Sequence, residues 1–234
     1  RQMKREGYKI LMPNMAPIHF RILVNVFRSY GYDCELLETT GPEIAQTGLK
    51  YVHNDTCYPA LLVIGQFIHA LQSGKYDVHK TALMMTQTGG GCRASNYIHL
   101  LRKALKKAGF PFVPVISLSF GMEKNSGFSL TLPLVRRFVG GVVYGDQLML
   151  LSNQTKPYEV NKGETMALVE QWIDKISKML IEGKGYSMEE VDENLHKLTK
   201  DFSKIELNRV PKVKVGVVGE IYVKYSKMAN NGLE

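Results

Sequence analysis

The sequence contains little cysteine, and its few cysteines lie far apart. Only three occur among 234 residues, at Cys34, Cys57 and Cys92. This scarcity excludes the disulfide framework of a small secreted domain, so a reducing cytoplasm is the expected location. Long apolar runs are also missing, since none approaches the roughly 20 residues that cross a bilayer. We therefore expect no membrane partner.

Internal repeats and low-complexity segments are absent as well, which excludes solenoid and disordered classes. Hydrophobic residues make up 44% of the chain and charged residues 22%, as in ordinary globular proteins. The net charge of +8 favours acidic partners in general. Its basic residues are scattered or lie at helix ends, so no nucleic-acid partner is expected. Both chain ends look cut, which suggests a piece of a longer polypeptide.

The apolar residues alternate between short β-rich runs and longer helical periods. The pattern predicts strands at 8–12, 34–38, 81–85 and 112–118, and helices at 16–30, 58–72 and 93–108. This order predicts an α/β fold over residues 1–120, a Rossmann-like parallel sheet flanked by helices. Pro114 places the last strand at an edge of that sheet.

After about residue 120 the pattern becomes mainly helical, and this segment is predicted to extend over 121–210. Two helices are expected within 129–154, broken at Gly140 and Gly141, and a third over 164–182. Ser187 with Glu190 forms a capping box that opens a fourth helix. After Pro211 the run "VKVGVVGE" predicts a buried strand, and with it the truncated start of a second α/β half-domain over 211–234.

One cysteine follows three glycines in the stretch "QTGGGCRASNY". The stretch is predicted to connect a strand to a helix, at the carboxyl edge of the sheet where ligands bind. Gly89, Gly90 and Gly91 allow the backbone to approach a bound group closely. A thiol at the following helix start, next to Arg93, is expected to have a lowered pKa. Cys92 is therefore a candidate metal ligand or nucleophile.

The stretch "HNDTCYP" repeats this arrangement around Cys57. Asp55 or Thr56 is expected to cap the helix at 58–72, and Pro59 is tolerated in its first turn. Cys57 and Cys92 are thus predicted to lie at consecutive strand-to-helix turns on one rim of the sheet. Such a pair can form a disulfide, bind zinc, hold an iron–sulfur cluster or act as redox thiols, and plain structural cysteines fit equally. The close spacing typical of zinc ligands is absent.

Three stretches together are similar to a known family. "KYVHNDTCYPALLVIGQFIHAL", "QTGGGCRASNY" and "GVVGEIYVKY" resemble the domain associated with 2-hydroxyacyl-CoA dehydratase activases, a domain related to the dehydratase subunits and to the double-cubane cluster proteins. The resemblance runs from about residue 8 to the end of the sequence. It implies an iron–sulfur cluster, of the 4Fe-4S or double-cubane kind, in a low-potential electron-transfer system of anaerobic bacteria.

The resemblance also implies ligands and partners. Cys57 and Cys92 match the cluster cysteines, and a third family cysteine lies beyond the sequence given. We therefore expect an incomplete and labile cluster site. The implied partners are an ATPase activase module, in the same or another chain, and a dehydratase subunit or acyl-CoA substrate. The fragment alone is not expected to catalyse a reaction.

Polar residues near the two cysteines are candidates for supporting roles at the cluster site. Arg93 and Asn96 can donate hydrogen bonds to cluster sulfides, and Glu220 is a candidate site carboxylate. Cys34 is interpreted as a buried hydrophobe, and Tyr97 as packing. Two other functions stay open: an interaction module without a cluster, and a nucleotide- or CoA-binding domain that holds phosphate with "TGGG".

Overall fold

The chain divides into two units that interleave along the sequence. The structure, a computed structural model, describes residues 2–87, 93–118 and 131–233. The first unit comprises Arg1–Ala16, Gly31–Ser129 and Val218–Glu234, and the second comprises Pro17–Tyr30 and Leu130–Val217. We describe each unit by itself.

The first unit is built on a four-stranded parallel sheet. Its strands are β1 (Lys9–Pro13), β2 (Asp33–Leu37), β3 (Thr81–Thr86) and β4 (Val115–Leu118), in the order β2-β1-β3-β4. The register pairs Lys9 with Asp33 on one side and with Thr81 on the other. The predicted α/β fold is confirmed, and β4 lies at an edge as Pro114 indicated.

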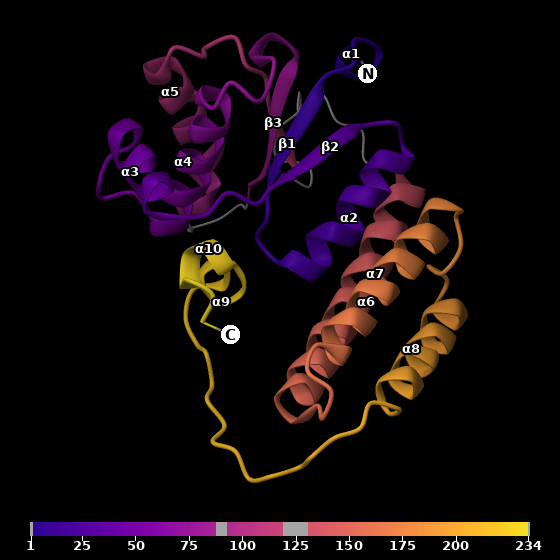
Figure 1. Cartoon of the computed structure of the whole chain (residues 1–234). Helices are drawn as coiled ribbons and strands as arrows, with labels where there is room; N and C mark the ends of the chain where they lie inside the picture. The colour runs from indigo at the N-terminus through magenta and orange to yellow at the C-terminus, as the bar shows by residue number, and fades with distance from the viewer. Residues whose placement is uncertain (1, 88–92, 119–130, 234) are drawn as a thin grey trace. The chain divides into compact units, whose positions relative to one another are not determined.

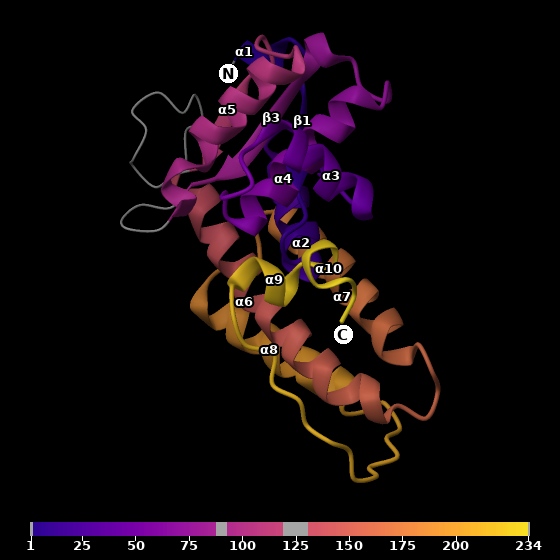
Figure 2. The same ribbon diagram turned by 90° about the vertical axis from the view of Figure 1, so that its left-hand side faces the viewer.

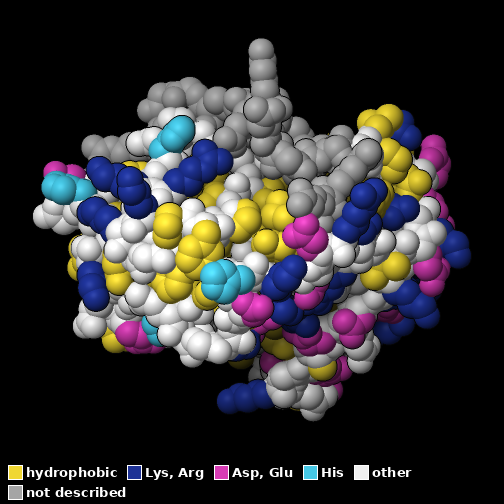
Figure 3. Space-filling view, turned by 90° about the horizontal axis from the view of Figure 1, so that it is seen from above, with side chains coloured by type: hydrophobic (Ala, Val, Ile, Leu, Met, Phe, Trp, Pro, Cys, Tyr) yellow, Lys and Arg dark blue, Asp and Glu magenta, His cyan; other side chains and the backbone are white. Residues whose placement is uncertain are grey.

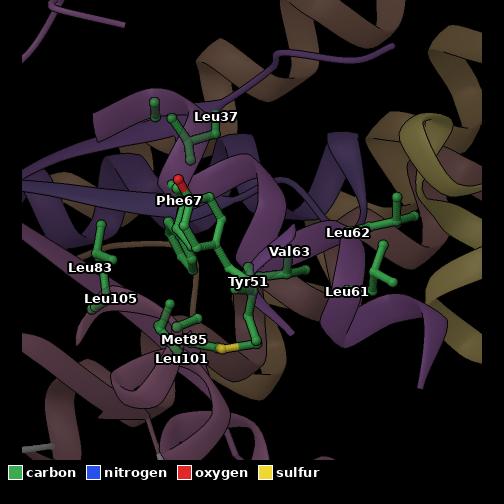
Figure 4. Close-up of a cluster of buried hydrophobic side chains, with 14 of the residues drawn as sticks. Leu37, Tyr51, Leu61, Leu62, Val63, Phe67, Leu83, Met85, Leu101 and Leu105 are labelled. Atoms are coloured by element: carbon green, nitrogen blue, oxygen red, sulfur yellow. The ribbon is translucent and has the colours of Figure 1, made fainter. Parts of the chain in front are cut away.

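Three helices lie together on one side of this sheet: α3 (Pro42–Tyr51), α4 (Tyr58–Gln72) and α5 (Tyr97–Ala108) (Figure 1). They share one hydrophobic core with the strands (Figure 4), to which the sheet contributes Leu11, Leu37, Leu83 and Met85. Predicted helix 58–72 is confirmed as α4. Helix 93–108 begins later than predicted, because a short 3₁₀ turn, η2 (Arg93–Asn96), precedes α5. Gly109 ends α5 in the left-handed conformation, as expected of a C-cap glycine.

Helix α3 was not predicted, and its position against α4 depends on two glycines. A Cβ added at Gly48 would lie 2.3 Å from the Leu61 carbonyl oxygen. One added at Gly65 would lie 2.2 Å from the Ile44 carbonyl oxygen. No real Cβ approaches a backbone oxygen so closely, so these glycines let the two helices cross with their backbones in contact. Because α3 ends at Tyr51 and α4 begins at Tyr58, this crossing fixes the position of the short segment between them.

Five shorter elements complete the first unit: α1 (Gln2–Arg5), η1 (Val78–Lys80), η2, α9 (Ile221–Tyr225) and α10 (Lys227–Asn230). Helix α10 packs against α4 and α9, and the buried ring of Tyr222 in α9 joins the core of the unit. Residues far apart in the sequence therefore surround α4.

The second unit consists of helices that lie side by side in both ribbon views (Figures 1 and 2). They are α2 (Pro17–Ser29), α6 (Leu132–Thr155), α7 (Glu164–Ile181) and α8 (Met188–Phe202), with the short η3 (Lys156–Tyr158) after α6. Helix α6 packs against the other three. The capping box is confirmed, since Ser187 and Glu190 each accept the other's backbone N–H. The helical prediction for this region therefore holds.

The predicted break at Gly140 and Gly141 is wrong, because α6 continues through both residues. A Cβ at Gly141 would lie 3.2 Å from side-chain carbons of Ile22 and of Leu23. The glycine therefore serves close packing against α2. Glycine weakens a helix by only about 1 kcal/mol, which tertiary contacts of this kind outweigh.

The buried strand predicted after Pro211 is also wrong. Residues 211–219 form no strand, and Val213 and Val218 are 91% and 89% exposed. A β-rich run becomes a strand only where the edge of a sheet accepts its backbone hydrogen bonds. Within the part of the chain that the structure describes, 211–219 has no such neighbour.

We predict that Gly65→Ala destabilises the first unit by about 1–3 kcal/mol, because the added methyl group meets the backbone of α3. Urea unfolding followed by circular dichroism measures the change. Gly216→Ala is the control, since nothing lies within 4 Å of its added Cβ. Equal stabilities of the two variants would show that the crossing of α3 and α4 is looser than described.

Candidate functional site

Two helices of the first unit begin at the same edge of the sheet. Helix α4 runs toward the start of β3, so its own first turn lies at the carboxyl ends of the strands. Helix α5 follows the carboxyl end of β3 through the connection 87–96. Ligands of open parallel sheets bind at this edge. One detail differs from the prediction, because α3 intervenes and Cys57 lies between two helices rather than after a strand.

Cys57 occupies the N-cap of α4. Its carbonyl oxygen accepts the first helical hydrogen bond, from Leu61 N at 3.1 Å. The Cys57 side chain makes no capping hydrogen bond, and because the N-cap is Cys57, the prediction that Asp55 or Thr56 caps the helix is wrong. Asp55 instead pairs with His53 in the exposed turn before the helix. The uncapped N-terminus directs partial positive charge at the cysteine.

The half-buried Cys57 thiol contacts the first residue of α5. Its Sγ lies 3.1 Å from the Tyr97 hydroxyl. When the sulfur is a thiolate or a metal ligand, the tyrosine O–H donates this hydrogen bond. Tyr97 packs against the hydrophobic core, as predicted, and its contact with Cys57 was not predicted. Tyr97 opens the helix that follows the "GGGCR" stretch, and this position is the only signal for it in the sequence.

The ends of the glycine loop are tied together. Gln87, just after β3, donates from Nε2 to the Ser95 carbonyl oxygen in η2 at 2.7 Å. This bond spans the loop between β3 and the first turn of α5. Gly89, Gly90, Gly91 and Cys92 lie outside the described residues. Gln87 and Ser95, which flank these residues, therefore lie close to the start of α5, where Tyr97 contacts Cys57.

Arg93 and Asn96 lie at the two ends of η2. The Asn96 side chain is exposed and does not cap α5. The Arg93 backbone belongs to the same 3₁₀ turn. Both residues therefore belong to the connection that leads from the glycine loop to Tyr97.

Glu220 is the N-cap of α9, where its Oε2 accepts a hydrogen bond from Val223 N at 3.1 Å. Residues 211–219 before it do not form the expected strand. The Glu220 carboxylate therefore caps a helix and does not follow a strand. Burial raises the pKa of neighbouring Tyr222 to about 12, and the charges of Glu220 and Tyr58 add to this effect. These interactions indicate that the first turn of α9 lies near Tyr58, the residue after Cys57.

The other described cysteine is not at this edge. Cys34 is fully buried in β2, as predicted. Across residues 2–87, 93–118 and 131–233, no group of three or more His, Cys, Asp and Glu residues could hold a metal ion. The same residues include no helix long and apolar enough to cross a membrane. Cys57 is therefore the one thiol that the described residues place at the carboxyl edge.

A hollow of about 350 Å³ lies elsewhere in the first unit, against β2 and the end of α4. Glu35, one of two glutamates that line it, accepts hydrogen bonds from Lys75 Nζ and from the Tyr76 hydroxyl, both at 2.7 Å. Burial opposes ionisation of Glu35, but these donors outweigh it and lower its pKa to about 2. The carboxylate is thus already neutralised by protein groups, and the hollow is a weaker candidate than the edge at Cys57.

On the face shown in Figure 3, the positive charges are not gathered into one patch. Lys and Arg side chains lie there among acidic and apolar ones. Comparisons with known proteins add no further assignment, because no family model, no curated protein and no solved structure matches the chain. The candidate site rests on the geometry around Cys57.

We predict that Cys57→Ser raises the free energy of unfolding by about 0.5–1 kcal/mol. A serine oxygen at the N-cap accepts a hydrogen bond from the first turn far better than sulfur does. Urea unfolding of the metal-free protein measures this gain. The matched control is Cys34→Ser, which buries a hydroxyl in β2 and should be destabilising. A loss of stability from Cys57→Ser would mean that the thiol serves packing.

We also predict that Glu35→Gln destabilises the protein near neutral pH by on the order of 1 kcal/mol. Because folding lowers the pKa of Glu35, its contribution is present above its ordinary value of 4.5 and is lost as the pH falls toward 2. Unfolding midpoints across this range should therefore converge for the two proteins. Exposed Glu38→Gln serves as the control. A difference independent of pH would contradict the role of the ionised carboxylate.

Proposed function

We propose that the first unit is an iron–sulfur domain for low-potential electron transfer, with Cys57 as one cluster ligand. The observation that carries the proposal is the Cys57 sulfur, half-buried at an uncapped helix N-terminus and in contact with the Tyr97 hydroxyl. Both features suit a sulfur that ligates a metal centre, because partial positive charge and an O–H donor face it there.

The donors available to a cluster can be counted. The described residues supply one thiol at this edge, whereas iron–sulfur clusters are usually held by four ligands. Cys92 is the second ligand in this proposal. It precedes Tyr97 by five residues, so its Cα lies within about 18 Å of the Tyr97 Cα whatever path the chain takes. The remaining ligands would come from another polypeptide segment or from an external thiol, which makes the cluster labile.

Tyr97 has a specific role in this proposal. A hydroxyl that donates to a ligating sulfur withdraws charge from the cluster and favours its reduced state. Helix α9 begins near Tyr58, the residue that follows Cys57. Arg93 and Asn96 would donate further hydrogen bonds to sulfides, and Glu220 would lie near the rim of the site.

The reaction proposed for the whole system follows from the resemblance given above. An ATPase partner would drive one electron onto the cluster in the cytoplasm. A dehydratase subunit would use that electron to remove hydroxide from a 2-hydroxyacyl-CoA. The chain described here would carry the electron and would not itself turn over substrate.

The test is anaerobic reconstitution of the chain with ferrous iron, sulfide and a small thiol that fills the missing ligand position. The wild-type protein should gain bound iron, acid-labile sulfide and the visible absorbance of sulfide-to-iron charge transfer. Cys57→Ser and Cys92→Ser should each lose most of all three signals. Cys34→Ala should retain them, because Cys34 is buried in the sheet away from this edge.

Two outcomes would contradict the proposal. One is a wild-type chain that binds no iron under these conditions. The other is iron binding that survives both Cys57→Ser and Cys92→Ser. A thermal shift with inorganic phosphate or CoA in the absence of iron would then favour the nucleotide- or CoA-binding function.

A further inference from the structure

Helix α6 is apolar on two opposite faces. Its inner face packs against α2, α7 and α8, with Tyr144 and Leu148 fully buried. Its outer face also carries large apolar side chains: Leu132, Val139, Val143 and Leu150 are 64%, 59%, 37% and 51% exposed. A helix at the surface of a globular protein normally turns polar residues outward. The outer face of α6 therefore needs a different explanation.

The exposed residues follow a heptad pattern. Leu132, Arg136, Val139, Val143, Asp146 and Leu150 are separated alternately by four and three residues, the spacing of the a and d positions of a coiled coil. At 3.6 residues per turn, all six lie on one side of the helix, within a band about 80° wide. We call these six residues the outer stripe. The stripe extends over about 27 Å, at 1.5 Å per residue.

The outer stripe is symmetric about Gly141. Leu132 and Leu150 lie equally far from it in sequence, and so do Val139 and Val143. Arg136 and Asp146 are the third such pair, and both side chains are exposed. When two copies of α6 lie antiparallel with Gly141 at the centre, each member of a pair faces the other member on the second copy. A two-fold axis requires such self-complementarity.

The two charges in the stripe select this arrangement. In the antiparallel pair, Arg136 of each copy faces Asp146 of the other, and both ion pairs lie in the seam. In a parallel pair, Arg136 would face Arg136 and Asp146 would face Asp146. A polar residue at an a or d position is known to set register and orientation in this way. Asp146 also contacts His19 at 3.0 Å, which positions its carboxylate.

We propose that the outer stripe of α6 binds a second copy of this chain in an antiparallel, two-fold symmetric contact. A single pair of helices buries an area at the low end of specific interfaces, so the dimer is weak and dissociates on dilution. The contact is independent of the cluster proposal, because it involves the second unit alone.

Charge exchange provides the test, with sedimentation velocity of the full 234-residue chain over a range of concentrations. The wild-type protein should sediment faster as its concentration rises. R136D and D146R should each dimerise at least tenfold more weakly, because each brings two like-charged pairs into its own dimer. An equimolar mixture of the two variants should recover the wild-type affinity, since the mixed dimer pairs every acid with a base.

An apolar substitution completes the experiment. Val139→Asp should weaken dimerisation at least tenfold, whereas Ile181→Asp should leave it unchanged. Ile181 is 45% exposed at the end of α7 and lies outside the stripe. Circular dichroism of each variant verifies that the helices are intact.

Three results would overturn the proposal. A wild-type chain that stays monomeric at every concentration excludes the second copy as the occupant of the stripe. Binding of such a monomer to phospholipid vesicles, lost in Val139→Asp, would assign the stripe to a lipid surface. A mixture of R136D and D146R that remains monomeric would rule out the antiparallel register.

Discussion

The contact between the Cys57 sulfur and the Tyr97 hydroxyl is the interaction on which this account depends. It joins two helix starts that are 40 residues apart in sequence. One reason is that both helices begin at the carboxyl edge of one parallel sheet. The other is that Gly48 and Gly65 let the backbones of α3 and α4 cross in contact, which places the start of α4. The hydrophobic core shared by α3, α4 and α5 then maintains this geometry. The sheet thus fixes a sulfur between an uncapped helix N-terminus and a hydrogen-bond donor.

The cysteine at the N-cap of α4 stabilises the folded protein less than a good capping residue would. Serine, threonine, asparagine and aspartate stabilise this position, and cysteine does not. Asp55 and Thr56 lie directly before Cys57, yet Cys57 is the residue at the N-cap. A position where a better capping residue would stabilise the protein, but a thiol is found, is typical of functional sites. The same reasoning gives Cys34 no such role, because a small apolar group in the sheet is all that its burial requires.

Sequence reasoning worked where local rules decide the structure. The alternation of β-rich and helical runs predicted the parallel sheet, Gly109 predicted the end of α5, and Ser187 with Glu190 predicted the start of α8. It failed where distant contacts decide. Gly141 suggested a break in α6, but the packing of α2 against that glycine keeps the helix continuous. The run after Pro211 resembles a strand, but no described sheet edge pairs with it. The Tyr97 contact was equally invisible, since it depends on how α4 and α5 are arranged in space.

The cluster proposal is tested most directly by the reduction potential of the reconstituted protein, measured for the wild type and for Tyr97→Phe. Phenylalanine keeps the ring and removes only the O–H donor to the Cys57 sulfur. If that sulfur ligates the cluster, losing the hydrogen bond leaves more charge on the metal centre and lowers the potential. An unchanged potential would contradict the account, because it would mean that iron binds away from Cys57.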